Sequence, residues 1–265
     1  GVAVCAAAIV FYFGGTMELT NCLLMLICSF ILFEQLDSAG SFSSLFRSID
    51  IGVDQANAIL GVKPMDIEKR SFEIITELLG DRVLDPENEL VIKRVIHTTA
   101  DFDYADNLTF SDHAVQKGIA ALKGGCDIVT DTQMAKAGIN KTILASLGGE
   151  VHCFMSDPDV AQEARSRGVT RAFVSMEKAA ALEKPCIFAI GNAPTALISI
   201  YHLIEEGKNS PALIIGVPVG FVNVEISKER IIEKARAPYI VARGRKGGSN
   251  VAAAICNALL YQIRR

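Results

Sequence analysis

Pro185-Cys-Ile-Phe-Ala-Ile190 is a short, unbroken apolar run that ends in the polar turn Gly191-Asn-Ala-Pro194, and it indicates the class of fold. A continuous apolar run, rather than one that alternates with polar residues, is typical of a strand that is buried on both faces. Similar runs occur at Cys126–Thr130, Val151–Met155, Ala212–Val217 and Tyr239–Ala242. The sequence therefore predicts a core of parallel strands.

Stretches of helical character follow each run, at Thr132–Leu147, Asp159–Leu182, Pro194–Glu206, Ser227–Ala235 and Ser249–Ile263. Parallel strands joined by helices make right-handed crossovers that cover both faces of a sheet. The pattern predicts an α/β fold with three layers, a doubly wound, flavodoxin-like sheet of five parallel strands in the order 2-1-3-4-5. Earlier helices, predicted at Ile67–Leu79, Glu87–Ile96 and Ser111–Leu122, must pack on the outside of this sheet or cover its mouth.

The charge of the chain excludes some classes of partner. The formal net charge is −4, and it lies in residues 1–61, so the longer remainder is balanced. A body without a basic stripe and without tryptophan argues against a nucleic-acid partner. The seven cysteines form no Cys-x-x-Cys pair and mostly lie in apolar runs, which indicates small buried side chains in a reducing, cytoplasmic compartment.

The first sixty-one residues differ from the rest. Val2–Phe13 and Cys22–Phe33 are nearly unbroken apolar runs, and Ser44–Leu60 is a polar stretch of helical character. This segment, 1–61, resembles the last transmembrane helices of an ATP-binding-cassette exporter, but no Walker motif follows it. A hydrophobic helical hairpin and a gene-fusion or assembly scar are the alternatives. Gly61-Val-Lys-Pro64 marks the boundary to a second domain, 62–265, and any membrane contact is expected only through residues 1–61.

The predicted sheet indicates where a ligand binds. In open parallel sheets, ligands bind beyond the carboxyl ends of the strands. The turn Arg243-Gly-Arg-Lys-Gly-Gly-Ser249 lies at such an end, and its glycines, cations and following helix favour an anion such as a carboxylate. The alternative is that the glycines only make a tight turn between strand and helix.

His97 is the candidate for proton transfer. It ends the short apolar stretch Arg94-Val-Ile-His97 and opens a segment of hydroxyls and carboxylates. Imidazole is the side chain that most readily gives and takes protons near neutrality. Arg94, three positions earlier, could hold an anionic substrate against it. The competing interpretation is a helix-terminal histidine that its neighbours satisfy.

From residue 63 to the end, the chain is similar to the precorrin-8X methylmutase family, which includes the cobalt-precorrin-8 methylmutases. The matching segments occur in the family's order, at Pro64–Phe72, Arg94–His97, Asp127–Asp131 with Met134 and Ala137–Ile139, Gly191–Ala196, Gly216–Val222 and Gly244–Ser249. The resemblance implies a flavodoxin-like homodimer with its site near the subunit interface. It implies no SAM, metal or nucleotide cofactor, and any cobalt belongs to the substrate.

The resemblance also implies a reaction and a set of site residues. A methyl group moves from C-11 to C-12 of the corrin precursor, which gives hydrogenobyrinate or its cobalt analogue, cobyrinate. The catalytic histidine falls on His97 and the substrate contacts on Ser71 and Arg94, so the first helix of the domain must fold back towards His97. Further candidates for the substrate's carboxylate arms are Arg171, Asn192, Arg243, Arg245 and Lys246.

One departure from the family and two other interpretations stay open. The family usually has a Glu-Ser-Lys triplet after Gly-Phe-Val, whereas here Glu225-Ile-Ser-Lys228 shifts the acid by one position. A SAM-dependent methyltransferase, or another α/β enzyme of tetrapyrrole metabolism, would need a glycine-rich turn after the first strand, and Asp131-Thr-Gln133 has none. A fragment of a membrane transporter would place the function in residues 1–61.

Overall fold

The computed structural model describes residues 14–15, 18, 21–24 and 64–264 of the chain. The chain divides into two compact units, Gly1–Lys69 and Arg70–Arg265, and the division falls inside helix α3 (Pro64–Leu79). The domain boundary predicted between residues 61 and 62 lies outside the described residues. The sheet and all the predicted site residues belong to the second unit.

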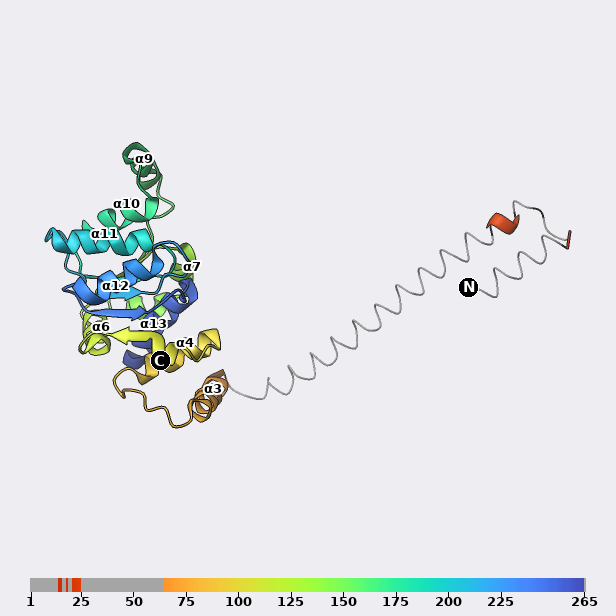
Figure 1. Ribbon diagram of the computed structural model, residues 1–265, viewed down its shortest axis with the longest axis horizontal. Helices are drawn as coiled ribbons and strands as arrows, with labels where there is room; N and C mark the ends of the chain where they lie inside the picture. Colours follow the sequence, from red (N-terminus) through yellow and green to blue (C-terminus); the bar gives the residue numbers. More distant parts are fainter. Residues whose placement is uncertain (1–13, 16–17, 19–20, 25–63, 265) are drawn as a thin grey trace. The chain divides into compact units, whose positions relative to one another are not determined.

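A mixed six-stranded sheet forms the centre of the second unit (Figure 1). Its strands are β1 (Leu108–Phe110), β2 (Asp127–Thr130), β3 (Val151–His152), β4 (Cys186–Ile190), β5 (Leu213–Gly216) and β6 (Tyr239–Ala242). The spatial order is β1-β6-β5-β4-β2-β3, with β2 to β6 mutually parallel and β1 antiparallel to β6. The five predicted strands correspond to β2–β6 and, numbered as predicted, lie in the order 2-1-3-4-5.

The helices of the second unit cover both faces of this sheet. They are α4 (Glu89–Thr99), α5 (Tyr104–Asn107), α6 (Ala114–Lys123), α7 (Gln133–Gly138), α8 (Lys141–Ser146), α9 (Pro158–Arg167), α10 (Arg171–Ala180), α11 (Pro194–Glu205), α12 (Val224–Lys234) and α13 (Ser249–Ile263). Successive strand residues point to opposite faces, so Ile187 joins a core with α4, α6, α7 and α13, whereas Phe188 joins a core with α10, α11 and α12. The unit therefore has three layers.

Two of the predicted helices are each divided in the structure. Asn140 accepts a hydrogen bond from the Ile143 amide (3.1 Å) and so begins α8 as a separate helix. Gly168 adopts a left-handed conformation (φ 65°) that ends α9, and Thr170 caps α10. Asparagine and threonine compete for local backbone groups in this way, which is why they favour helix starts over helix interiors.

The sequence did not predict β1. This strand has three residues with a polar threonine at its centre, which is too short to give a periodic signal. It pairs with β6 in antiparallel register, Thr109 opposite Val241, and so forms one edge of the sheet. Tertiary pairing with β6, rather than local preference, makes this segment a strand.

Helix α4 brings its C-terminal end to the carboxyl edge of the sheet. It packs against α13, and residues of its first half lie near the last turn of α13 around a shared pocket. At its other end, Asp101 binds Lys246, which lies just before α13 begins. The two helices therefore run in opposite directions, and α4 ends near the turn that connects β6 to α13.

The N-terminal segment for which the sequence predicts exporter-like helices lies almost wholly outside the described residues. Within the described part, no helix has both the length and the apolar character needed to cross a membrane. The exporter resemblance, and any membrane contact through residues 1–61, stay predictions.

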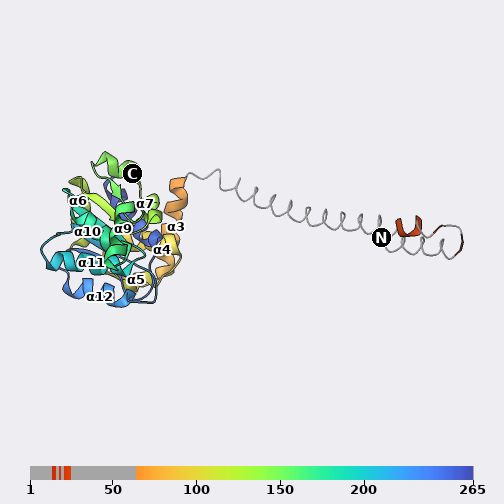
Figure 2. The same cartoon turned by 90° about the horizontal axis from the view of Figure 1, so that it is seen from above.

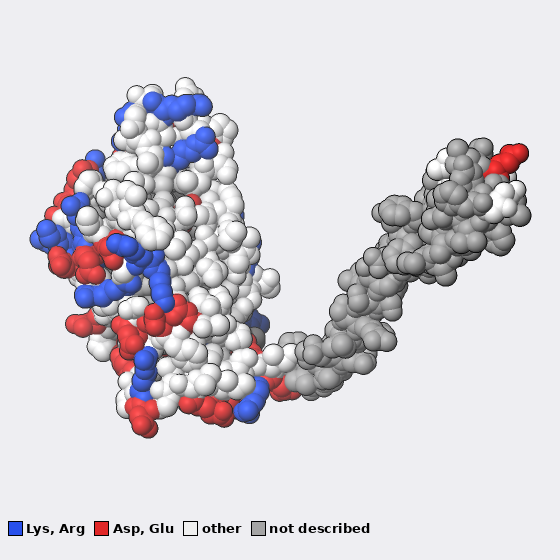
Figure 3. Space-filling view, turned by 45° about the vertical axis from the view of Figure 1, so that its right-hand side comes forward, with Lys and Arg blue, Asp and Glu red and all other residues white. Residues whose placement is uncertain are grey.

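Acidic and basic side chains are mixed on one face of the second unit (Figure 3). On the face shown in Figure 3, most basic side chains lie interspersed with acidic ones, and a broad area carries little charge. A nucleic-acid site would gather lysine and arginine along one face. The absence of such a partner stays a prediction.

Candidate active site

The last two turns of α4 carry the two central residues of the predicted site. Arg94 is half-buried and His97 is exposed, while Val95 and Ile96 between them are buried in the core. The helix ends at Ala100, whose left-handed backbone (φ 54°) donates its amide to Ile96 O (2.7 Å). The core side of α4 is thus fixed by packing, and its outer side presents His97 to solvent.

Helix α3 folds back onto α4 through Phe72, as the sequence predicted for this part of the chain (Figure 2). The Phe72 ring meets the His97 ring edge-on, with centroids 5.7 Å apart and planes at 76°. The Arg94 guanidinium lies over the same ring, 5.0 Å from its centroid. Ser71 is half-buried on α3 beside Phe72. The structure therefore brings His97, Arg94 and the segment of Ser71 into one place.

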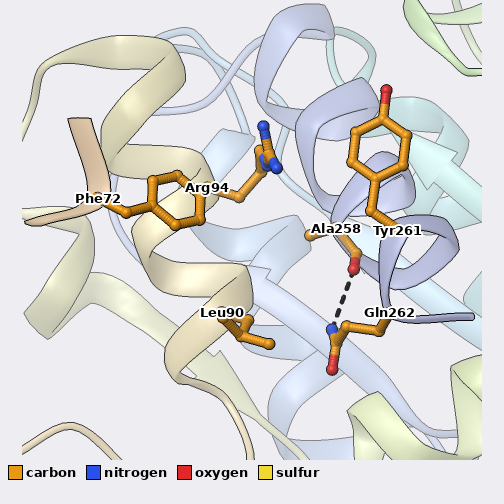
Figure 4. A pocket seen from close by; sticks show the side chains of 6 residues that line it. All are labelled: Phe72, Leu90, Arg94, Ala258, Tyr261 and Gln262. Carbon is orange, nitrogen blue, oxygen red and sulfur yellow. Dashed lines mark hydrogen bonds between the residues drawn. The ribbon is translucent and has the colours of Figure 1, made fainter. Parts of the chain in front are cut away.

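A pocket lies beside Arg94, between α3, α4 and α13 (Figure 4). It has a volume of about 370 Å³ and is lined by Phe72, Leu90, Arg94, Ala258, Tyr261 and Gln262. The Arg94 guanidinium lies 5.2 Å from the centroid of the Tyr261 ring, so aromatic rings from α3 and α13 flank it. Such contacts hold a guanidinium in a defined orientation.

Two carboxylates follow His97 and hold one of the predicted cations. Lys246 donates hydrogen bonds to Asp101 (2.6 Å) and Asp103 (2.5 Å). These bonds raise the pKa of Lys246, and the Lys246 ammonium lowers the pKa of Asp101. Lys246 was predicted as a substrate contact, but here its charge is already shared between two acids.

The glycine-rich turn packs its backbone closely against neighbouring loops. A Cβ on Gly247 would lie 2.1 Å from Val217 O, and one on Gly191 would lie 2.7 Å from Ser249 Cα. Gly248 donates its amide to Val217 O (2.9 Å), so that group is already used within the protein. These contacts favour the interpretation of a tight strand-to-helix turn over that of an open anion cradle.

The remaining predicted contacts lie at the same carboxyl edge. Arg243 and Arg245 are exposed and approach acids of α12, Glu229 at 3.7 Å and Glu225 at 3.5 Å. Neither is shown in contact with His97. Arg245 also lies over the Phe221 ring, 5.5 Å from its centroid.

Arg171 belongs to the opposite helical layer, and Asn192 lies in the loop after β4. Arg171 begins α10, and the preceding Thr170 shares a hydrogen bond with Thr195 of α11 (2.9 Å). Asn192 is exposed in the loop after β4, whose amides are held by the buried Asp131. Neither residue is shown in contact with His97.

The structure adds residues that the sequence did not single out by role. Phe72 and Tyr261 flank Arg94, and Asp101 and Asp103 hold Lys246. The carboxylates were visible as a polar segment after His97, whereas nothing local marked Tyr261 as a neighbour of Arg94. The part of the chain that the structure describes holds no cluster of residues suited to a metal ion.

The second unit is thus an α/β fold in which an exposed histidine lies beside an arginine that two aromatic rings flank. A family model described as precorrin-8X methylmutase matches residues 66–262. The chain belongs to the precorrin-8X methylmutase family, and is thus an isomerase of cobalamin biosynthesis. This confirms the resemblance of the chain from residue 63 onwards to the methylmutase family. The methyltransferase and transporter interpretations are left without support.

Individual relatives agree with this assignment. The chain is 47% identical over 208 residues to cobalt-precorrin-8 methylmutase of Salmonella typhimurium, which covers 76% of this chain and 97% of that protein. It is 37% identical over 194 residues to precorrin-8X methylmutase of Pseudomonas aeruginosa, covering 73% and 93%. A solved structure of precorrin-8X methyl mutase from Thermus thermophilus matches with a TM-score of 0.67 at 38% identity, covering 74% of this chain and 96% of that one.

Proposed function

We propose that the chain moves a methyl group from C-11 to C-12 of cobalt-precorrin-8 and so gives cobyrinate. Membership of the family supports the reaction class. The single observation that supports the site is the contact of His97 and Arg94 with one ring, Phe72. A proton donor and a carboxylate clamp are thereby held at a fixed separation on one helix face.

His97 acts in this proposal as the proton donor and acceptor. Protonation of the conjugated macrocycle makes C-12 more electron-poor, so the bond from the methyl carbon to C-11 breaks as the bond to C-12 forms. The rearranged ring then returns the proton to His97, and no atom is gained or lost overall. Such general acid–base assistance contributes roughly 10²–10⁴-fold, so positioning of the substrate supplies much of the remaining acceleration.

The substrate's carboxylate arms and its apolar ring need different surfaces. Arg94 can bind one carboxylate with two parallel hydrogen bonds, because its guanidinium is planar and already oriented by aromatic neighbours. Ser71 beside it can donate to a second arm. The loop after β5 exposes Val219, Phe221 and Val222, which can cover part of the macrocycle.

The choice of a cobalt-containing substrate follows from the relatives. Identity is 47% to the Salmonella typhimurium protein, named for cobalt-precorrin-8, and 37% to the Pseudomonas aeruginosa protein, named for precorrin-8X. The cobalt would enter and leave within the substrate ring. Parallel assays with the metal-free precorrin-8X decide between the two, since faster conversion of precorrin-8X would reverse this choice.

The cellular setting belongs to the same proposal. Among the described residues, Cys22, Cys126, Cys153, Cys186 and Cys256 are all buried and free of disulfides. Together with the enzyme family, this supports a reducing, cytoplasmic location. We expect a homodimer that uses no cofactor of its own.

The central test replaces the histidine. His97→Ala should still bind the product corrinoid but should lose conversion, followed by the absorbance change of the pigment. His202→Ala is the matched control, because His202 also lies in the last turn of a helix and meets a phenylalanine ring, Phe173, at 6.3 Å. Near-normal turnover by His97→Ala would refute the acid–base role.

A further inference from the structure

Lys228 of α12 is a buried cation for which the proposed reaction gives no role. Its side chain has no exposed surface. Its ammonium donates to two main-chain oxygens, Gly244 O and Lys246 O, each at 2.8 Å. A buried charge is costly unless hydrogen bonds replace its water. The two carbonyls of the glycine-rich turn are therefore what keeps this ammonium in the interior.

Charged groups around Lys228 do not form a close pair with it in the structure. Burial lowers its pKa to about 8, while Glu225 and Glu229 on its own helix act in the opposite direction. Those two acids approach Arg245 and Arg243 of the turn instead. At neutral pH Lys228 still carries its proton, and it donates to the backbone of the turn.

Three successive carbonyls of the turn accept hydrogen bonds. Gly244 O and Lys246 O accept from Lys228, and Arg245 O accepts from the Gly220 amide (3.2 Å). With these carbonyls bound, the turn has a defined backbone conformation. That conformation sets where the side chain of Lys246 leaves the turn.

The outer end of the turn binds the segment that ends α4. Lys246 holds Asp101 and Asp103, and Asp103 also donates its amide to Asp101 (3.0 Å). Asp101 in turn donates its amide to the hydroxyl of Thr99, within the last turn of the helix that carries His97 (3.3 Å). A continuous chain of contacts thus runs from α12, across the edge of the sheet, to α4.

We propose that Lys228 is a positioning residue for His97, because it fixes the glycine-rich turn whose Lys246 anchors the end of α4. Lys228 and Lys246 work as one brace with the turn between them, so removing either end releases the same segment. The inference rests on the proposed role of His97. A displacement of about 1 Å at a reacting group can cost a hundredfold in rate.

The first experiment measures whether the two lysines act together. Lys228→Met and Lys246→Met should each lower kcat for cobalt-precorrin-8 by about ten- to a hundredfold, with KM changed less than about threefold. The kcat of the double variant should be no lower than that of the less active single variant, because the effects of residues that act as one unit are not additive. Lys228→Arg should recover part of kcat, since a guanidinium can also donate to both carbonyls. Multiplied losses in the double variant would overturn the proposal.

A second experiment weakens the brace at its exposed end, because it removes the two carboxylate charges that bind Lys246. The buried Lys228 stays in place. Asp101→Asn combined with Asp103→Asn should lower kcat by about tenfold or more, with an unchanged melting temperature. Asp106→Asn is the matched control, because it removes an exposed pair with Arg82 (3.0 Å) from the same segment without touching the turn. Wild-type kcat in the double asparagine variant would overturn the brace.

The two proposals fail in different ways. Full activity of His97→Ala would refute the proposed role of His97. Loss of activity in His97→Ala together with wild-type kcat in the Asp101→Asn, Asp103→Asn variant would leave that role intact and refute the positioning role of Lys228.

Discussion

The end of α4 and the glycine-rich turn meet at the same edge of the sheet, but they are built in opposite ways. The end of α4 presents an exposed histidine, and its partners there are side chains such as Phe72. The turn is held mainly through its backbone, with Gly247 against Val217 O and two carbonyls on Lys228. Lys246 is the contact that joins them.

This difference separates the end of α4, which carries the proposed reacting group His97, from the glycine-rich turn, which holds the end of α4 in place. An exposed side chain can change protonation state and meet a substrate, and its loss costs little folding energy. A turn packed through its backbone tolerates no added atom, but it carries no reacting group itself. Substitutions in the two regions should therefore affect different measured quantities.

The largest expected effect is on activity and lies at the end of α4. His97→Gln should lower kcat by roughly 10²–10⁴-fold, because the amide cannot exchange a proton near neutral pH. Its free energy of unfolding in urea should stay within about 0.5 kcal/mol of the wild type, since the residue is exposed. A large loss of stability would show that His97 has a structural role in the fold.

In the turn, a substitution should also lower the stability of the fold. Gly247→Ala should lower the free energy of unfolding by about 3 kcal/mol, because its Cβ would lie 2.1 Å from Val217 O, a main-chain atom that cannot move aside. Gly168→Ala is the control, with positive φ but nothing within 4 Å of the new Cβ, and it should cost about 1 kcal/mol. Equal losses in the two variants would mean that the turn is not closely packed.

A smaller effect is expected at Arg94. Arg94→Lys should raise KM by roughly tenfold with a smaller change in kcat, because an ammonium cannot bind a carboxylate through two parallel hydrogen bonds. Arg230→Lys provides the comparison, since Arg230 also lies over an aromatic ring, Tyr201, at 5.4 Å but in the other helical layer. An unchanged KM in Arg94→Lys would remove Arg94 from the substrate site.

The smallest effect concerns the core beneath both regions and depends on pH. Burial raises the pKa of Cys256 and of Cys126 to about 12. Above pH 9 the unfolded chain loses these thiol protons while the folded chain keeps them, so stability falls as pH rises from about 9 towards 12. Cys256→Ala should make this decline shallower, by at most about 1.4 kcal/mol per pH unit. Urea unfolding at several alkaline pH values measures the slope, and an unchanged slope would contradict the assignment.

Strands and helices were predictable where the sequence carries a long apolar pattern. The runs that became β2, β4, β5 and β6 are continuous and branched, so their burial on both faces could be expected from their residues. The three-residue β1 could not be expected, because its partner is more than a hundred residues away at Ala242. The breaks at Asn140 and Gly168 fall on residue types that favour helix starts and helix ends, yet the longer helical pattern predicts one helix across each of them.

The candidate site was predictable only in part. His97, Arg94 and Ser71 came from the family resemblance, and the contact of Phe72 with His97 and Arg94 confirms that α3 folds back onto α4. The catalytic and binding roles of these residues stay predictions. The proposed substrate contact by Lys246 must now compete with two carboxylates that already hold it.

The class of fold, the parallel strands and the family could be predicted from the sequence, because apolar periodicity and ordered motifs are properties of neighbouring residues. The partners of each charge became known from the tertiary structure. Arg94 lies between rings of α3 and α13, and Lys228 and Lys246 act on opposite sides of one turn. These pairings depend on how elements far apart in the chain pack together. The free energy of burying or sharing a charge depends on the atoms that surround it in the folded protein, rather than on the residue's own neighbours in the sequence.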